Sequence, residues 1–260
     1  MGLSAAPVTM SLPELSYTIW FSQRVGSTWF SEALASSGIA GRPAEYLNFA
    51  RTDDALKHYA VSSAIELLHR IYALGTTANG VFGIKMGYSE HRFNGILDLI
   101  GGPTDGGPVP RLQRWETAFP NHRHIFMTRR NKVRLAVSWW RAIKSGEWHR
   151  RSGRRAELPD IVGDYDAAAI DTLMQQAVVR EAGLQELFTE AGVVPLEIGY
   201  EDAVQDLLGS INRVLAHLGL PPQSAISPDV DIQKTADDLN EEWVQRFRHD
   251  RQEGWENRAW

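Results

Sequence analysis

The sequence predicts an α/β protein with a P-loop-like, mostly parallel sheet flanked by helices, and three observations support this. Short apolar runs alternate with long stretches of helical periodicity, the pattern of repeated strand–helix units. The first run leads through a small polar loop directly into a helix. No internal repeat or linker divides the chain, so we expect a single domain with helical insertions over 16–252, preceded by an extension at 1–15.

Four apolar runs are short enough and rich enough in β-forming residues to be strands. The first suits a strand buried in a parallel sheet, because it is almost continuously apolar and aromatic. The second is followed by Lys85 and the third by Thr128, so both strands end in polar side chains. The four runs are Tyr17–Phe21, Val81–Ile84, Ile125–Met127 and Val193–Ile198. In sheets of this kind, ligands bind at the carboxyl ends of the strands.

Amphipathic stretches between and after these runs predict helices. In one of them, Ile170, Leu173, Ala177 and Leu184 fall on one face at helical spacing. The helical patterns cover about 53–74, 131–145, 165–191, 201–218 and 236–252. Segment 101–110 has seven Gly or Pro residues in ten positions and is predicted to be a loop.

The composition excludes several classes of function. Acidic residues outnumber basic ones, 32 to 27, so the chain lacks the positive field that attracts nucleic acid. It has no cysteine, which excludes disulfides, thiolate metal sites and cysteine nucleophiles. The spacing of His91, His122 and His124 does not suit metal ligands, so we expect no metal. No apolar run approaches the roughly 20 residues of a membrane span, and we expect a soluble, cytoplasmic protein.

The small, polar segment Ser22–Thr28 joins the first predicted strand to the first helix. A glycine in such a loop lets backbone N–H groups close on an anion, and the helix N-terminus adds partial positive charge. The pattern is therefore typical of a phosphate-binding loop, although it lacks the Gly-Lys-Ser/Thr of a Walker A motif. The alternative is an ordinary helix cap, in which a hydroxyl of Ser27 or Thr28 satisfies the exposed N–H groups.

Two motifs resemble the signatures of the sulfotransferase superfamily. The run Arg24-Val-Gly-Ser-Thr-Trp29 is similar to the family's first phosphate loop, which has a basic residue, any residue, Gly, Ser or Thr, Thr and frequently Trp. After the third predicted strand, Arg130 is followed eight residues later by Ser138, as in the family's second signature. The two signatures occur in the same order and at matching places in the strand–helix pattern. The resemblance spans roughly residues 16–220.

This resemblance implies a donor and the residues that bind it. The donor is 3′-phosphoadenosine 5′-phosphosulfate (PAPS), used as a co-substrate without a metal. The residues implied to hold its 5′ phosphosulfate are Arg24, Gly26, Ser27 and Thr28. Arg130 and Ser138 are implied to bind the 3′-phosphate; the alternatives are an exposed charge at a helix start and a buried helix serine. Trp29 either stacks on adenine or is a core tryptophan.

Within the superfamily, the sequence is most similar to the bacterial Stf0 group. The similarity lies in Ser22–Thr28, Gly41–Tyr46 and Thr128–Lys132. Membership in this group implies transfer to a hydroxyl of a carbohydrate, with trehalose as the precedent, or of a glycosylated small molecule. It also implies a homodimer, although no residue of the chain identifies an interface.

The Stf0 resemblance changes the expected general base. Cytosolic sulfotransferases carry a catalytic histidine two residues after a lysine at the end of the second strand, but here Gly87 occupies that place after Lys85. In the Stf0 group a glutamate shortly after the first helix serves instead, and its counterpart is Glu45. A carboxylate can take the proton of an acceptor hydroxyl from about 3 Å. The alternative for Glu45 is a carboxylate in a surface turn.

Fixed cations are expected to neutralise the charge that develops during transfer, by analogy with phosphoryl transfer. Arg24 is the leading candidate, because a guanidinium stays charged and presents a planar fork to two oxygens. Lys85 is the second, with a salt-bridged lysine as the alternative. Trp148 and His149, just beyond the second signature, are predicted to bind the acceptor. The basic run at 149–155 either closes over the site or is solvated surface.

Two other functions remain open from the sequence. An NTP-dependent phosphotransferase uses the same loop geometry, but the missing Walker A lysine and the lack of a clear Mg²⁺ carboxylate argue against it. A nucleotide-binding module that has lost turnover would keep the same pocket. The acceptor itself cannot be read from the sequence, because acceptor loops vary independently of the donor site.

Overall fold

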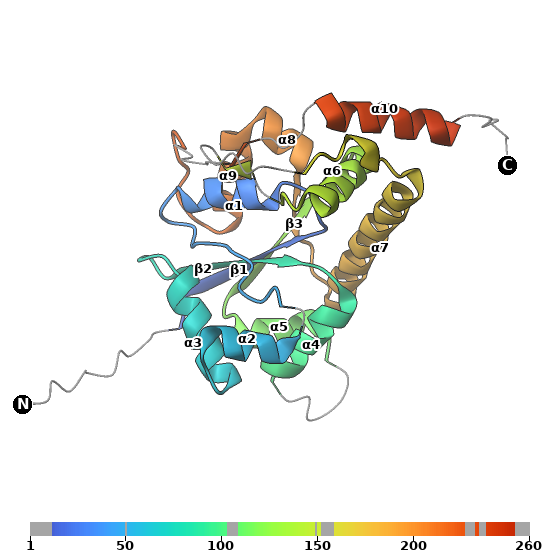
Figure 1. The fold of residues 1–260 in the computed structure, drawn as a ribbon. Coiled ribbons are helices and arrows are strands. Elements are labelled where there is room, and N and C mark those ends of the chain that lie inside the picture. The colour runs from blue at the N-terminus through green and yellow to red at the C-terminus, as the bar shows by residue number, and fades with distance from the viewer. Residues whose placement is uncertain are drawn as a thin grey trace, which may run out of the picture.

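The computed structural model describes residues 12–49, 51–102, 109–148, 150–151, 159–226, 232–233 and 238–252. At its centre is a four-stranded parallel sheet with the strand order β2-β1-β3-β5 (Figure 1). The strands are β1 (Leu15–Phe21), β2 (Val81–Gly87), β3 (His122–Thr128) and β5 (Leu196–Gly199). The predicted α/β class and the parallel sheet are confirmed. Each predicted strand is found, but β2 continues through Lys85 to Gly87, and β5 begins at Leu196 rather than at Val193.

The sheet register aligns the carboxyl ends of its strands. Phe21, the last residue of β1, pairs with Gly87 of β2 and with Met127 of β3. Thr128, the last residue of β3, pairs with Gly199 of β5. The segments that follow all four strands therefore begin along one edge of the sheet, which is where ligands bind in this architecture.

Helices cover both faces of the sheet (Figure 1). The upper layer contains α1 (Ser27–Ala35), α6 (Lys132–Ser145), α8 (Tyr200–Gln205), α9 (Leu207–His217) and α10 (Asp238–Gln252). The lower layer contains α2 (Thr52–Tyr59), α3 (Ala64–Gly75), α4 (Glu90–Ile100) and α5 (Arg111–Ala118). A short antiparallel pair joins β4 (Arg150–Arg151) to β6 (Ile232–Gln233). None of the described helices combines the length and apolar composition that crossing a bilayer requires.

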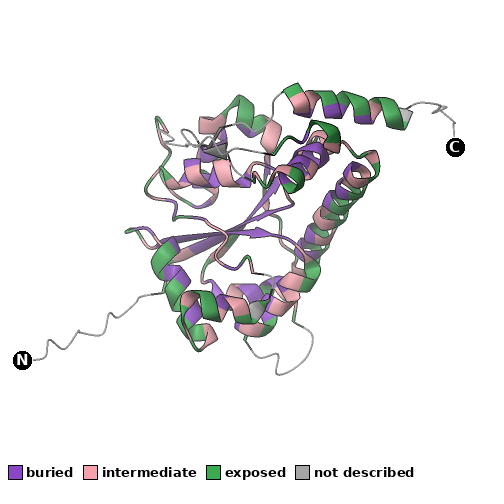
Figure 2. Cartoon of the chain, in the orientation of Figure 1, coloured by how far each residue is buried: buried purple, intermediate pink, exposed green. Residues whose placement is uncertain are grey.

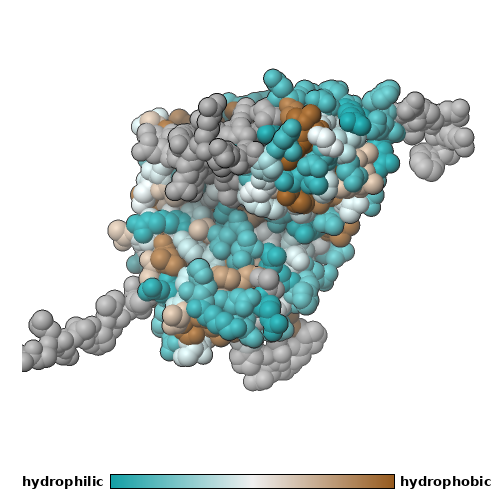
Figure 3. Space-filling model, in the orientation of Figure 1, coloured by the Kyte–Doolittle hydropathy of each residue, from teal (hydrophilic) through white to brown (hydrophobic). Residues whose placement is uncertain are grey.

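Two hydrophobic cores lie on the two faces of the sheet, and the strands between them are buried (Figure 2). Side chains of β1 alternate between these cores, as the pleat of a strand requires: Ile19 enters the core that contains α1 and α6, and Trp20 enters the other. The long helix α7 (Ala167–Ala191) contributes to both, with Leu173 in the first and Leu184 in the second. The face of the molecule shown in Figure 3 is mostly hydrophilic, with apolar side chains in separate groups.

The helices differ in detail from their predicted ranges. The predicted helix over 53–74 is two helices, because Ala60 after α2 has a left-handed backbone and Ser63 caps a new helix at the N–H of Glu66. The predicted helix over 201–218 is likewise divided at Asp206, whose carboxylate caps α9 at the N–H of Gly209. Helices α4 and α5 were not predicted.

A chain of hydrogen bonds runs through His122 on the lower side of the sheet. Ser16 Oγ donates to the carbonyl of Pro120, so it accepts from His122 Nδ1 at 2.9 Å. Burial disfavours the charged imidazole, so with the proton on Nδ1 the other ring nitrogen, Nε2, accepts from Thr18 Oγ1 at 2.9 Å. Thr18 Oγ1 in turn accepts from Trp115 Nε1 at 2.9 Å. The arrangement fits the neutral imidazole with its proton on Nδ1.

We predict that stability falls below about pH 6.5, the usual pKa of histidine. Burial lowers the pKa of His122 well below this value, and the charges of His124 and Arg123 lower it further. The unfolded chain then binds a proton that the native chain does not, so this contribution is complete above pH 6.5 and decreases by about 1.4 kcal/mol per pH unit on acidification. Urea unfolding of the wild type and His122→Asn between pH 5 and 7.5 measures the slope.

The slope should be shallower in the variant but not zero, because burial also lowers the pKa of His217. Parallel stability–pH lines for the two proteins would contradict the assignment of a neutral His122.

Candidate active site

The loop between β1 and α1 makes a sharp turn at the carboxyl edge of the sheet. Arg24 and Gly26 both have left-handed backbones, with φ values of 60° and 78°. A Cβ added to Gly26 would lie 2.7 Å from a ring carbon of Tyr200, at the start of α8. Two features thus require glycine at position 26: the left-handed backbone and the Tyr200 ring packed against it.

The N-terminus of α1 has no side-chain cap. Ser27 is buried, and the hydroxyl of Thr28 accepts a hydrogen bond from Lys85. The N-cap position itself is Gly26, which has no side chain to cap the helix. An uncapped helix N-terminus of this kind leaves N–H groups and partial positive charge available to an anion.

Lys85 brings the loop and a glutamate together. Its side chain on β2 is almost fully buried, and Nζ lies 2.6 Å from Thr28 Oγ1 and 3.1 Å from Glu45 Oε1. Burial lowers the pKa of Lys85, while the negative charge of Glu45 opposes that shift. The predicted alternative of a salt-bridged lysine is thus found, and its partner is the predicted general base.

Backbone pairing explains why Glu45 lies beside Lys85. The segment after α1 returns along the edge of the sheet, where Ala44 forms an isolated parallel bridge with Ile84. The N–H of Lys85 donates to the carbonyl of Ala44 at 3.0 Å. The other carboxylate oxygen of Glu45 accepts from Asn48 Nδ2 at 2.7 Å. Glu45 is therefore a paired carboxylate near the carboxyl end of β2, and its side chain remains 27% exposed.

Two arginines crowd the other side of the loop. Arg24 Nε donates to Ser138 Oγ at 3.1 Å, and its Nη1 donates to the carbonyl of Trp148. Arg129 donates to the carbonyl of Arg24 at 3.2 Å and lies 4.4 Å from the ring centroid of Tyr200. Burial, together with the positive charge of Arg129, lowers the pKa of Arg24 to about 10. Such crowding is relieved by a bound anion.

Arg129 was not predicted as a site residue. Its Nε is buried and has no hydrogen-bond partner, which is costly for an ionised group. The sequence did contain a signal, because Arg129 lies two residues after the predicted strand Ile125–Met127, at its carboxyl end. The second signature includes only the neighbouring Arg130.

The predicted pair Arg130 and Ser138 belongs to two different networks. Both terminal nitrogens of Arg130 donate to the carboxylate of Asp202 at 2.7 Å, and this pairing raises the pKa of Arg130. Ser138, in contrast, is buried and accepts from Arg24. Within the described contacts, Arg130 and Ser138 are not hydrogen bonded to each other.

The predicted aromatic residues occupy different settings. Trp29 is partly buried and packs against the upper core, as a core tryptophan would. The side chain of Trp148 is 43% exposed, and its carbonyl is tied to Arg24. His149 lies outside the described residues. Among the residues that are described, no three His, Asp or Glu side chains gather where they could hold a metal ion.

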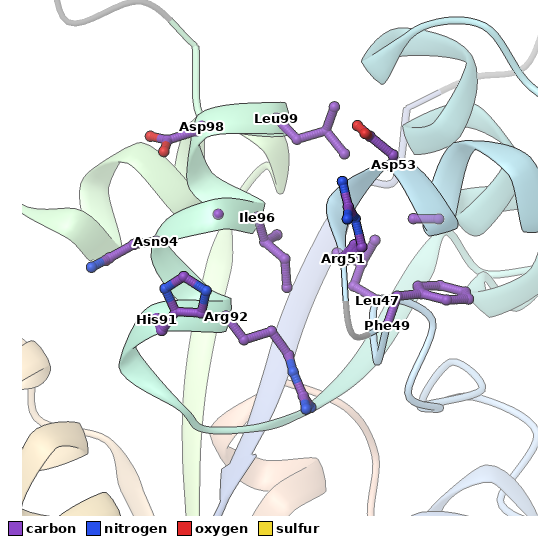
Figure 4. A pocket seen from close by; sticks show the side chains of 12 residues that line it. Leu47, Phe49, Arg51, Asp53, His91, Arg92, Asn94, Ile96, Asp98 and Leu99 are labelled. Atoms are coloured by element: carbon purple, nitrogen blue, oxygen red, sulfur yellow. The ribbon is translucent and has the colours of Figure 1, made fainter.

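A cavity of about 370 Å³ lies beside the segment that carries Glu45, between α4 and the start of α2 (Figure 4). Its walls include apolar side chains of Leu47, Phe49 and Ile96 together with the charged Arg51 and Arg92. Six of its twelve lining residues are polar or charged: Arg51, Asp53, His91, Arg92, Asn94 and Asp98.

Helix α7 fixes the start of the loop between β1 and α1. Glu181 accepts from the hydroxyl of Ser22 at 3.0 Å and from Lys132 Nζ at 2.6 Å. Lys132 also donates to the carbonyl of Arg129. These contacts hold the ends of β1 and β3 in register around the loop.

The parallel sheet, the uncapped helix N-terminus at its edge and the cations around it are the features of an α/β protein whose strand ends suit an anionic ligand. Residues 16–250 match the family model described as Stf0 sulphotransferase. The chain therefore belongs to the Stf0 sulfotransferase family and is a sulfotransferase, which confirms the resemblance inferred from the two motifs.

Curated relatives cover nearly the whole chain. A trehalose 2-sulfotransferase of Mycolicibacterium smegmatis is 28% identical over 94% of this chain and 98% of the relative. A trehalose 2-sulfotransferase of Mycobacterium tuberculosis is 26% identical over 92% of this chain and 96% of the relative. Among solved structures, a sulfotransferase from Alicyclobacillus acidocaldarius has a TM-score of 0.49 and 14% identity, with coverage of 92% of this chain and 93% of that one.

We predict that Gly26→Ala destabilises the fold more than Gly38→Ala. Both glycines have positive φ, 78° and 72°, but a Cβ at Gly38 would meet nothing within 4 Å. The left-handed backbone alone costs an alanine about 1–2 kcal/mol. The clash with Tyr200 adds roughly 1–3 kcal/mol in Gly26→Ala.

Urea unfolding of the two variants measures this difference. Tyr200→Leu in the Gly26→Ala background should recover part of the added loss, since it removes the ring that the new Cβ meets. Equal losses in Gly26→Ala and Gly38→Ala would show that the ring is not packed on the loop.

Proposed function

We propose that the protein transfers the sulfuryl group of PAPS to a hydroxyl of a carbohydrate or glycosylated small molecule. The observation that carries this proposal is the contact of Lys85 with both Thr28 and Glu45, at 2.6 and 3.1 Å. It joins a cation, the anion-binding helix and a carboxylate at one strand end. The two trehalose 2-sulfotransferases support a carbohydrate acceptor, with trehalose as the first to test.

The residues around the loop fit a donor of this kind. The uncapped N-terminus of α1 and the unpartnered Nε of Arg129 both offer N–H groups to an anion. We propose that Arg24, Gly26, Ser27 and Thr28 hold the 5′ phosphosulfate, as the first signature implies. PAPS supplies a sulfuryl group bonded to a phosphate that is a good leaving group. Lys85 and Arg24 offer N–H donors to the negative charge that develops on the departing oxygen.

For the far end of the donor we propose Arg130 and Ser138 as ligands of the 3′-phosphate, with Trp29 beside the adenine. Arg130 is 59% exposed at its side chain and oriented by its two bonds to Asp202, so its guanidinium is accessible and fixed. Ser138 would exchange its bond with Arg24 for one with the phosphate.

We propose that Glu45 is the general base. Each oxygen of an ionised carboxylate has two acceptor positions, and Lys85 and Asn48 occupy one on each oxygen of Glu45. A position therefore remains for the acceptor hydroxyl, whose proton moves to Glu45 as its oxygen bonds to sulfur. Trp148 and His149 stay proposals for acceptor contacts.

Incubation with labelled PAPS and a panel of sugars, beginning with trehalose, followed by mass spectrometry, tests the proposed function. We expect a mass gain of one SO₃ on at least one sugar. Calorimetric titration with adenosine 3′,5′-bisphosphate and with ATP–Mg²⁺ distinguishes the other two functions. Tight binding of ATP–Mg²⁺ alone would favour a phosphotransferase, and bisphosphate binding without transfer to any acceptor would favour a module without turnover.

Glu45→Gln is expected to lower kcat by roughly 10²–10⁴-fold, because the amide cannot take the hydroxyl proton. Binding of adenosine 3′,5′-bisphosphate should be retained, since Glu45 is proposed to act on the acceptor. Near wild-type turnover in this variant, with the bisphosphate still bound, would exclude Glu45 as the base.

Arg130→Ala is expected to weaken binding of adenosine 3′,5′-bisphosphate about 10-fold or more, because a charge-assisted pair is lost. Binding of adenosine 5′-monophosphate, which lacks the 3′-phosphate, should change little. Arg123→Ala, at the amino end of β3, is the control and should affect neither ligand. Equal loss for both nucleotides in Arg130→Ala would refute the role in 3′-phosphate binding.

A further inference from the structure

Asn48 lies between the proposed base and an arginine of the neighbouring cavity. Its Nδ2 donates to Glu45 Oε2 at 2.7 Å, and its Oδ1 accepts from Nη1 of Arg92. Asn48 belongs to the segment between α1 and α2, whereas Arg92 is on α4 and lines the cavity (Figure 4). The three side chains therefore connect two segments that are remote in the sequence.

The chemistry of the two neighbours fixes the orientation of the Asn48 amide. A guanidinium only donates hydrogen bonds, and an ionised carboxylate only accepts them. With Oδ1 facing Arg92, the NH₂ group faces Glu45. The flipped amide would set oxygen against the carboxylate and NH₂ against the guanidinium, losing both hydrogen bonds. Arg92 thereby selects the rotamer of Asn48 that serves Glu45.

Two donors, one on each oxygen, fix the plane of the Glu45 carboxylate. Lys85 holds Oε1 at 3.1 Å and Asn48 holds Oε2. With Lys85 alone the carboxylate could rotate about a single contact, and the lone pair offered to the acceptor hydroxyl would change direction. The rate of proton transfer is sensitive to that direction, because reacting groups must be aligned.

We propose that Asn48 is a positioning residue for Glu45 and that Arg92 holds it in its working orientation. The proposal rests on the proposed role of Glu45 as general base. Asn48 acts through Glu45, and Arg92 connects that orientation to the wall of the adjacent cavity. Turnover, and not donor binding, is therefore what Asn48 controls.

Asn48→Asp is the most discriminating variant. The aspartate still accepts from Arg92, but it cannot donate to Glu45 and sets a second negative charge beside it. We expect kcat to fall by roughly 10–100-fold, as for loss of a hydrogen bond to a charged group, with the sugar that accepts most rapidly in the panel. The acidic limb of the pH–rate profile should move to higher pH, and binding of adenosine 3′,5′-bisphosphate should change less than about twofold.

Asn94→Asp is the matched control. Asn94 lies two residues after Arg92 on α4 and lines the same cavity, so it carries the same change of charge to the same region. Its kcat and pH–rate profile should stay near those of the wild type. Arg92→Lys keeps a donor for Asn48 and should retain more activity than Arg92→Gln, which can also accept and no longer selects one amide orientation.

A double-mutant cycle tests whether Asn48 acts through Glu45. In the Glu45→Gln background, Asn48→Asp should lower kcat less than twofold further, because the group it positions is absent. Full additivity of the two losses would overturn the proposal, and so would a kcat for Asn48→Asp equal to that of Asn94→Asp. If Glu45→Gln itself kept wild-type turnover, the general-base role would fail first, which separates the two hypotheses.

Discussion

The site depends on one buried ammonium group. Lys85 lies two residues before the carboxyl end of β2 with 5% of its surface exposed, and its charge is tolerated there because Glu45 and Thr28 contact it. Those two partners come from the return segment and from the first turn of α1. A single charge thus specifies how three separate parts of the chain meet at the edge of the sheet.

Much of the fold followed from local patterns in the sequence. The four strands are short apolar runs with a clear boundary, such as Ile125–Met127, and parallel packing buries such runs on both faces. Helices α4 and α5 were missed because they flank the Gly- and Pro-rich segment, although Phe93, Ile96 and Leu97 do have helical spacing. The predicted helices over 53–74 and 201–218 are each divided in two, at Ala60 and at Asp206. These breaks depend on one backbone conformation and one capping contact, which hydrophobic periodicity does not reveal.

The part of the candidate site that lies in one short motif could also be predicted from the sequence. Arg24, Gly26 and Thr28 form a contiguous motif, so their meeting at the loop needed no knowledge of distant contacts. The contact of Glu45 with Lys85 depends on the bridge between Ala44 and Ile84, which brings together residues 40 positions apart. Asn48 carries no motif, and only the geometry reveals its two partners. The sequence motif pairs Ser138 with Arg130, but in the folded chain Ser138 accepts from Arg24 while Arg130 donates to Asp202. Only tertiary contacts determine these partners.

The left-handed backbone of Arg24 stores conformational strain at the point where the loop is anchored. An arginine with a φ of 60° is held in a conformation that glycine adopts without strain. The guanidinium offsets this cost through its hydrogen bonds to Ser138 of α6 and to the carbonyl of Trp148. Truncation of this side chain would leave the strain in place and remove the contacts that compensate for it.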